Sequence, residues 1–507
     1  MRFDFGIAMT GADAAPGRPG RLGSRVWKGL AGLAGALALV ALGFGLVARG
    51  HADLRPWHQV VPQGEPAAAE LDAGMNLATW LAREDAVLRD ARTRVEAALR
   101  GDEGPSSRYA PGAPVNPGGY ERDWNRTFEL AAASPKGLVL LLHGMTDGPY
   151  SLRTLGARLH AEGFHVLALR LQGHGTTPAA LLDARWEDWA AASRLGMRHL
   201  RAVGGGNLPL VVVGYSTGAA LAVQHHLAAL DDPALPRADR LVLLSPLLGL
   251  TRGAGFAPLV SALDRVPGFE KAAWLDVLPE YNPFKYNSFP VNGGWQSHRL
   301  VRAVADGLAR AKRTGTIDRL PPILTFHSVL DTTVRSDAVV RMLYGALPAN
   351  GSELVMYDVN RWSAFAPLFR PGQLDSVRRL FTAGPRAYTL RVVSNRDPGT
   401  RDAVEISVAP GAQARARREL GLAFPPEVFS LSHTAIPFPC SDPLYGIAPR
   451  TDEDFGVRLG TLALRGERHA LQVPMEQLAR LNCNPFFDDL AERTVAWVAG
   501  AGRRAGP

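Results

Sequence analysis

The chain has 507 residues, of which 46% are hydrophobic and 21% are charged, a balance typical of soluble globular proteins. That balance excludes a mostly disordered chain, a collagen-like repeat and a membrane protein of many helices. The formal net charge is +8, but only five of the 56 basic residues are lysine and the arginines are scattered. Because no Lys/Arg-rich tract is present to bind phosphates, we expect no nucleic-acid partner.

An uncharged apolar run occupies residues 29–48, directly after a basic N-terminus of residues 1–28. Twenty helical residues rise about 30 Å, enough to cross the hydrocarbon core of a bilayer, and basic residues beside such a run stay in the cytoplasm. We therefore expect a single-pass anchor in the inner (cytoplasmic) membrane, with the following residues periplasmic or otherwise extracytoplasmic. A cleaved signal peptide is an alternative, although its apolar region is usually shorter and the best cleavage site, Gly50-His51-Ala52, is weak. A helix buried inside a soluble domain is the second alternative.

Residues 49–119 connect this run to the main body of the sequence. Residues 76–100 place Leu, Val and Ala at helical spacing with charges on the opposite face. Residues 104–120 contain four prolines and four glycines, a composition typical of a loop. We expect a helical stalk and a Pro/Gly-rich linker, followed by a folded domain over residues 120–500.

Short apolar runs alternate with amphipathic stretches from residue 137 onward. The runs are bounded by Gly, Pro or polar residues, which predicts strands buried on both faces of a parallel sheet. The fold class is therefore α/β, with a doubly wound, mostly parallel sheet whose ligands bind at the carboxyl ends of the strands. The predicted strands are 138–142, 165–169, 210–214, 240–245 and 322–327, with helices around 150–162, 186–202 and 217–230.

The strongest motif is Gly214-Tyr215-Ser216-Thr217-Gly218, between a predicted strand and a predicted helix. A serine on such a sharp turn exposes its hydroxyl near a helix N-terminus, where N–H groups favour developing negative charge. The placement predicts that Ser216 is a catalytic nucleophile; a structural turn serine is the alternative.

Where a serine on this kind of turn is a nucleophile, an acid and then a histidine follow it along the chain. Two histidines follow the last predicted core strand, His433 and His469. His433 lies where a short apolar segment enters a proline-rich loop, which suits an imidazole above a sheet edge, whereas His469 lies in a segment typical of an exposed hairpin. We therefore prefer His433 as the base and expect His225 and His226, within the helix after the serine, to be structural.

Asp331 follows the carboxyl end of the strand at 322–327, where a carboxylate can hold the imidazole in the required tautomer. Asp358, within an apolar run, is the main rival, and Asp337 is expected to begin a helix. For the oxyanion, the turn His143-Gly144-Met145 predicts backbone donors at Met145 and at Thr217, the residue after the nucleophile. The alternative is an ordinary strand-ending turn, and His174 is interpreted as structural.

With these motifs together, the chain resembles the α/β-hydrolase superfamily, and in particular its monoacylglycerol lipase, lysophospholipase and serine-aminopeptidase-like branch. The resemblance covers roughly residues 120–500 and rests on the segments HGMTDGPYSLRTLGARLHAEGFHVLALRLQGHGT, GYSTG, SVLDTTV and LSHTAIPFP. It implies triad roles for Ser216, Asp331 and His433 and a cap inserted after the sixth strand, at about residues 247–318.

One departure from the family is a long insert at about residues 361–430, before His433, where the family usually has a short loop. The insert contains a predicted hairpin over residues 389–411. Its role is open.

Cys440 and Cys483 are the only cysteines, and in an oxidising compartment we expect them to form a disulfide bond. No Cys/His cluster has metal-ligand spacing, and no phosphate-binding glycine motif follows a strand, so we expect no metal and no cofactor.

The sequence as a whole predicts a membrane-anchored extracytoplasmic serine hydrolase that cleaves carboxylic esters of small, lipid-like molecules; protein partners are unknown. A serine aminopeptidase is the nearest alternative, with Glu270, Asp276 or Glu280 of the cap holding the free amine. A non-catalytic binding protein with the same fold is the second alternative.

Overall fold

The computed structural model describes residues 27–28, 31–32, 35, 43, 50–99, 107–249, 270–382, 384, 386–450, 453–467 and 470–502. Most of the expected anchor at residues 29–48 lies outside these residues. Within them, no helix combines the length and the apolar character that a membrane span requires.

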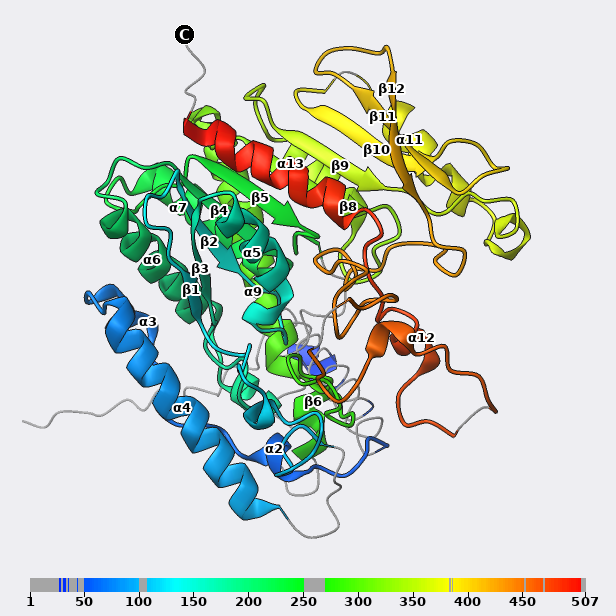
Figure 1. The fold of residues 1–507 in the computed structure, drawn as a ribbon. Coiled ribbons are helices and arrows are strands. Elements are labelled where there is room, and N and C mark those ends of the chain that lie inside the picture. Colours follow the sequence, from blue (N-terminus) through cyan, green and yellow to red (C-terminus); the bar gives the residue numbers. More distant parts are fainter. Residues whose placement is uncertain are drawn as a thin grey trace, which may run out of the picture.

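A ten-stranded sheet with the order β1-β3-β2-β4-β5-β8-β9-β10-β11-β12 forms the centre of the structure (Figure 1). The seven strands from β3 to β10 in this order run parallel, whereas β1, β11 and β12 are antiparallel to their neighbours. The mostly parallel sheet is the predicted one, and the strands are β1 (Phe128–Leu130), β2 (Leu138–Leu142), β3 (His165–Leu169), β4 (Leu210–Tyr215), β5 (Arg240–Leu244), β8 (Ile323–Ser328), β9 (Glu353–Tyr357), β10 (Thr389–Asn395), β11 (Asp402–Val408) and β12 (Ala416–Ala423).

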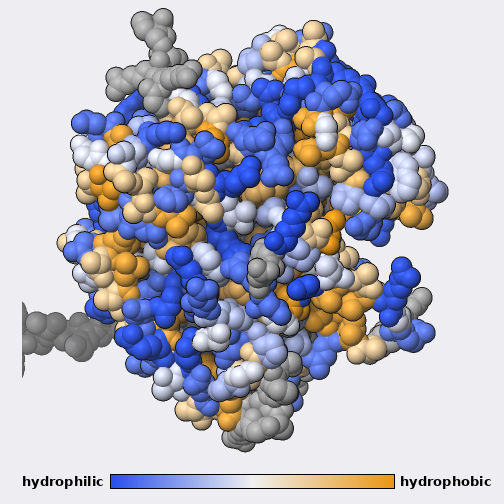
Figure 2. Space-filling model, viewed as in Figure 1, coloured by the Kyte–Doolittle hydropathy of each residue, from blue (hydrophilic) through white to orange (hydrophobic). Residues whose placement is uncertain are grey.

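Helices cover both faces of the sheet, and the central strands β2 and β4 are buried at every position. In β2, Leu138, Leu140 and Leu142 contribute to one core cluster, and Val139 and Leu141 contribute to the other, as alternation along a strand requires. The first cluster is covered by α6 (Trp186–Val203), α7 (Thr217–Asp231) and α9 (Val291–Thr314), the second by α5 (Arg153–Ala161) and α13 (Phe487–Ala499). On the face seen in Figure 2, hydrophilic residues predominate and apolar residues gather in separate patches.

The helix α9 lies in the segment where we expected the cap. Its residues Leu300, Val304, Leu308 and Ala311 are buried in the same core cluster as α7. The 3- and 4-residue spacing of these apolar side chains is that of a core-facing helix. The end of the expected cap is thus a layer of the core. Its described beginning consists of η6 (Glu270–Ala273), β6 (Trp274–Asp276) and β7 (Phe289–Pro290).

The segment expected as a stalk and linker packs on the core domain. Its helix α4 (Leu77–Ala98), capped by the Asn76 side chain that accepts the Thr79 N–H, buries Trp80 and Val87 completely. The segment also contains α2 (Pro56–Gln59) and α3 (Ala68–Asp72). An amphipathic helix gains free energy by burying its apolar stripe, and here the core domain provides the surface.

A buried ion cluster joins this N-terminal segment to the core. Arg170, which follows β3 and is fully buried, donates to Glu84 of α4 at 3.1 Å and to both oxygens of Glu65 at 2.7 and 3.0 Å. Glu84 in turn accepts from the Thr127 amide and hydroxyl. The guanidinium and the two carboxylates find these hydrogen-bond partners only when the N-terminal segment is docked on the core.

The insert adds β10, β11 and β12 to one edge of the sheet. The hairpin predicted at residues 389–411 is present as β10 and β11, and β10 extends the parallel sheet beside β9. The third strand, β12, was not predicted, because its sequence ARRELGLA is largely exposed and charged and lacks the alternation of a half-buried strand.

We predict that Arg170→Leu destabilises the protein by about 3–5 kcal/mol, because it leaves the buried Glu84 and the partly buried Glu65 without their cation. Urea unfolding of the variant and the wild type measures the difference. Arg83→Leu is the matched control, since Arg83 pairs with Glu70 at 3.5 Å with both side chains 46% exposed, and such pairs contribute about 0–1 kcal/mol. Equal effects of the two substitutions would contradict the prediction.

Candidate active site

Ser216 lies on a sharp turn between β4 and α7. Its backbone has φ 53° and ψ −111°, a conformation that L-residues rarely adopt. The flanking glycines make the turn sterically feasible: a Cβ on Gly214 would lie 2.5 Å from the Ala219 Cα, and one on Gly218 would lie 2.1 Å from the Leu142 oxygen. The motif identified in the sequence thus has a physical role at both glycines.

His433 and Asp331 form a buried pair at the same edge of the sheet. The His433 Nδ1 and the Asp331 Oδ2 are 2.7 Å apart, and the other oxygen of Asp331 accepts the amides of Thr333 and Val334 at 2.8 and 2.9 Å. The carboxylate is therefore oriented by its own loop, and it holds the imidazole by Nδ1, which leaves Nε2 for chemistry.

The His433 ring lies against the serine turn through Tyr215. The two ring centroids are 5.4 Å apart, and the Tyr215 hydroxyl donates to the His433 carbonyl at 3.4 Å. Among the described residues, the Ser216 hydroxyl makes no hydrogen bond to His433. Contacts of this kind are often long before substrate binds. The three residues predicted as a triad thus meet at one edge, with the acid–imidazole contact formed.

Burial alone would raise the pKa of Asp331, but the neighbouring His433, through charge and hydrogen bonding, outweighs it and lowers the pKa to about 2. A second imidazole also faces this carboxylate. His327 is fully buried at the end of β8, with its Nδ1 3.9 Å from the Asp331 Oδ2, and burial lowers its pKa to about 4. His327 was not predicted from the sequence; its signal is a histidine at the end of a strand, four residues before the acid.

The rival residues have other partners or lie outside the described chain. Asp358 accepts the Ser394 hydroxyl at 2.7 Å and pairs with Arg361, so its carboxylate is engaged away from His433. His225 and His226 bond backbone carbonyls of Pro236 and Ala222, both at 2.7 Å. His469 lies outside the described residues.

The turn after β2 presents the predicted oxyanion donor Met145. The His143 Nε2 accepts the Leu171 amide at 3.0 Å, so the neutral ring carries its proton on Nδ1 and donates it to the Gly144 carbonyl at 2.8 Å. Burial supports this neutral form by lowering the pKa of His143 to about 3. In a trans peptide the N–H points opposite to the C=O. The ring therefore fixes the direction of the Met145 N–H.

Three non-glycine residues have positive φ in the described chain: Thr146, Ser216 and Ser245. They follow the carboxyl ends of β2, β4 and β5, which are adjacent in the sheet. Such strained positions cluster at functional sites. The carboxyl edge expected to carry chemistry is thus also where the backbone is most strained, a feature that the sequence pattern showed only at Ser216.

A disulfide bond joins Cys440 to Cys483, 43 residues apart, as expected from the sequence. Beside it, the Asn484 backbone N–H donates to the Phe438 carbonyl at 2.8 Å, and its side-chain Nδ2 donates to the Ile436 carbonyl at 3.1 Å. These contacts attach the loop that carries His433 to the segment before α13.

One of the three cap acids named for an amine site, Glu280, is already engaged by the protein. Glu280 is buried, and its carboxylate accepts the amides of Asn287 and Ser288. The hydrogen-bonding capacity of this carboxylate is used within a turn of the cap. One aromatic residue of the cap packs on the core: Phe284 stacks on Tyr150 with centroids 4.2 Å apart.

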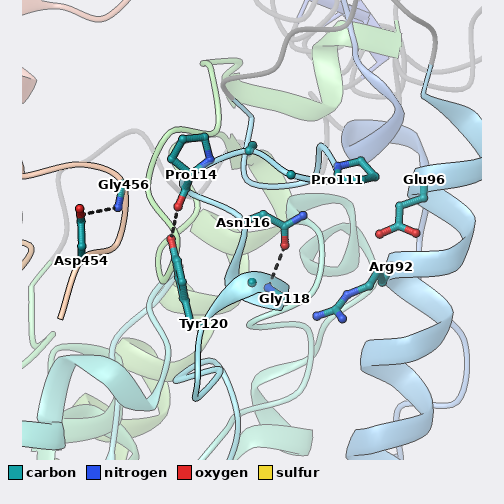
Figure 3. A pocket seen from close by; sticks show the side chains of 12 residues that line it. Arg92, Glu96, Pro111, Pro114, Asn116, Gly118, Tyr120, Asp454 and Gly456 are labelled. Carbon is teal, nitrogen blue, oxygen red and sulfur yellow. Dashed lines mark hydrogen bonds between the residues drawn. The ribbon is translucent and has the colours of Figure 1, made fainter.

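A hollow of about 550 Å³ lies between α4 and the loop over residues 111–120, away from these residues (Figure 3). Arg92 and Glu96 reach it from α4, and Asp454 lies on the opposite side. None of its lining residues belongs to the candidate site. Within the described chain, no cluster of His, Cys, Asp and Glu could hold a metal ion.

We predict that replacing both Cys440 and Cys483 by Ser lowers the free energy of unfolding by about 2–4 kcal/mol, because a closed loop of this length restricts the unfolded chain. Urea unfolding in the presence and absence of reductant measures the effect. Reductant should destabilise the wild type and leave the double variant unchanged; identical curves for all samples would contradict the prediction.

A second prediction concerns Asp331 and acid stability. Because its pKa falls from the ordinary 3.8 to about 2 on folding, its contribution is complete above about pH 4 and is lost as the pH falls through 2. Asp331→Asn should therefore flatten the dependence of unfolding free energy on pH between 4 and 2. Asp488→Asn, an exposed acid, should keep the wild-type slope. Parallel curves for Asp331→Asn and the wild type would refute this.

Residues 133–361 match the family described as serine aminopeptidase, S33. The match includes Ser216 and Asp331 and ends before most of the insert and before His433. No curated protein matches the chain.

Similar solved structures include one from work on LipS and LipT, two metagenome-derived lipolytic enzymes, with 24% identity, 47% of this chain and 88% of that chain covered, and a TM-score of 0.35. A monoacylglycerol lipase from Paleococcus ferrophilus has 15% identity, coverage of 50% and 95%, and a TM-score of 0.33. A soluble variant of monoglyceride lipase from Saccharomyces cerevisiae has 16% identity, coverage of 50% and 87%, and a TM-score of 0.36.

The family match confirms the resemblance inferred from the sequence motifs: residues 133–361 are similar to the S33 serine aminopeptidase family of α/β hydrolases.

Proposed function

We propose that this protein is a membrane-anchored, extracytoplasmic serine hydrolase that cleaves carboxylic esters of lipid-like molecules. The observation that carries the proposal is the buried Asp331–His433 pair, 2.7 Å apart, beside the strained turn of Ser216. A fold needs none of these three side chains in this arrangement for its own stability, so their meeting at the carboxyl edge supports catalysis over a binding function alone.

In the proposed reaction the Ser216 hydroxyl attacks the ester carbonyl, and its proton passes to the His433 Nε2. Asp331 stabilises the imidazolium that results. The amides of Met145 and Thr217 hold the oxyanion; neither donates to another protein group in the described chain. When the tetrahedral intermediate collapses, the C–O bond to the alcohol breaks and the alcohol leaves with the proton from His433. Water then attacks the acyl-enzyme by the same route and releases the acid.

An ester is favoured over an N-terminal peptide by the state of the cap. Glu280 is committed to the amides of Asn287 and Ser288, so it offers no free carboxylate to a substrate amine. The family description nevertheless names a serine aminopeptidase, which keeps a peptidase as the second candidate.

The location rests on the sequence and on the disulfide bond. Residues 29–48 are long and apolar enough for a span, and basic residues precede them. The Cys440–Cys483 bond is the form expected in an oxidising compartment. Both features support an extracytoplasmic catalytic domain.

Labelling with a charged, membrane-impermeant fluorophosphonate tests site and location together. In intact spheroplasts that express the full chain, we expect an adduct on Ser216, mapped by mass spectrometry and lost in Ser216→Ala. His433→Ala should reduce the labelling rate by a factor of about 10³ or more, because the hydroxyl loses its base. Ser193→Ala, in a buried helix position bonded to the Trp189 carbonyl, should label normally.

Labelling only after lysis would refute the proposed location, and an adduct absent from folded wild-type protein would refute the hydrolase. Unlabelled wild-type enzyme then distinguishes the substrates. Purified protein in detergent should hydrolyse medium-chain acyl esters faster than aminoacyl amides, and the reverse order would favour the peptidase.

A further inference from the structure

The oxyanion turn over residues 144–147 is held by groups outside its own strand. The Asp147 amide closes the turn on the Gly144 carbonyl at 3.3 Å, and Thr146 between them has φ 64°. A β-branched residue resists this conformation. The Tyr286 amide, from the cap segment, donates to the Thr146 carbonyl at 2.8 Å. The strained residue is thus held by a contact from 140 positions further along the chain.

The neighbouring cap residue supplies a charge to the same turn. The Lys285 Nζ lies 3.0 Å from the Asp147 Oδ2, and the two side chains are 22% and 5% exposed. A carboxylate so deeply buried needs a partner, and Lys285 is the cation with which Asp147 forms an ion pair in the described chain. Asp147 is two residues after Met145, the proposed oxyanion donor, so its charge lies close to where negative charge would develop.

The cap segment that carries Lys285 is itself firmly placed. Asn282 donates to the Tyr445 hydroxyl at 2.7 Å and accepts from Arg108 at 3.3 Å. The Tyr286 hydroxyl accepts the Thr176 amide at 2.7 Å and itself donates to the Gly173 carbonyl at 3.0 Å. Contacts from the N-terminal segment, the core and the C-terminal segment therefore fix the position of Lys285 relative to the turn.

We propose that Lys285 is a positioning residue for the oxyanion site: it neutralises Asp147 and, with the adjacent Tyr286 amide, holds the Thr146 turn so that the Met145 N–H faces the substrate. The inference rests on the proposed hydrolase function. It makes the cap a working part of the oxyanion site as well as a cover. Without the ammonium, the Asp147 carboxylate repels the oxyanion, and the turn loses one of its supports.

The test uses the full chain in detergent, with an ester substrate and a fluorophosphonate. Lys285→Met keeps the length and apolar stem of the side chain and removes the charge. We expect kcat and the rate of fluorophosphonate inactivation to fall together by about tenfold, with KM nearly unchanged, because a displaced donor acts on the transition state. Lys285→Arg should recover part of the loss. The double variant Lys285→Met/Asp147→Asn should recover more, since it removes the unpaired charge.

Lys271→Met is the matched control. Lys271 is also a cap lysine, and its Nζ lies 2.9 Å from Asp53, whose side chain is 93% exposed; its removal should leave both rates unchanged. Thermal unfolding of each variant separates a local effect from loss of the fold.

The inference is overturned if Lys285→Met keeps the wild-type kcat and inactivation rate, if the loss appears in KM alone, or if the double variant is as slow as the single one. A wild-type protein that the fluorophosphonate does not label would instead refute the proposed function, and the inference with it.

Discussion

The approach of α7 to the ends of β2 and β4 is the constraint on which the candidate site depends. The Gly218 amide donates to the His143 carbonyl at 3.1 Å, and no side chain fits at Gly218 beneath the Leu142 oxygen. This close packing forces Ser216 into its strained turn and places the first amides of α7 beside the turn after β2. The neighbouring strand is tied in by the Leu247 amide, which donates to the Ser216 carbonyl at 3.1 Å. The positions of the nucleophile and of the oxyanion donors are thus both fixed by the close packing of α7 against the ends of β2 and β4.

The acid and the base depend on loops that the sheet edge alone does not hold. Asp331 is oriented by two amides of its own loop, whereas the loop of His433 is fastened by the disulfide bond and by Asn484. The turn that carries Met145 is supported by His143 from one side and by Lys285 and Tyr286 of the cap from the other. A catalytic geometry that needs tolerances of about 0.5 Å requires such outside support.

Buried carboxylates recur through the molecule, and several of them pair with arginine. Glu84 and Glu65 share Arg170, and Glu405 is buried between Arg391 and Arg493. Arginine suits these positions because its planar guanidinium donates to two acceptors at once and stays charged when buried. The predominance of arginine over lysine noted in the composition thus has a structural use in joining the N-terminal segment and the insert to the core.

The sequence by itself determined the features that local patterns encode. Continuous apolar runs predicted the parallel strands, and the glycines around Ser216 predicted its turn, because burial on both faces and a sharp strand-to-helix turn each leave a short-range signature. The positions of Asp331 and His433 followed from their order along the chain. The pairing of Asp331 with His433 was decided by tertiary structure, since only the folded chain shows that the rival Asp358 is engaged by Arg361 and Ser394.

Tertiary structure also decided how the additional segments are arranged. The helix α4 has the pattern of any amphipathic helix, and its docking on the core is visible only in tertiary contacts such as the pair of Glu84 with Arg170. The strand β12 carries no strand pattern and forms because β11 offers it an edge. The link between Lys285 and Asp147 spans 138 residues. Contacts of this kind depend on which surfaces meet once the core has formed, and no local periodicity records them.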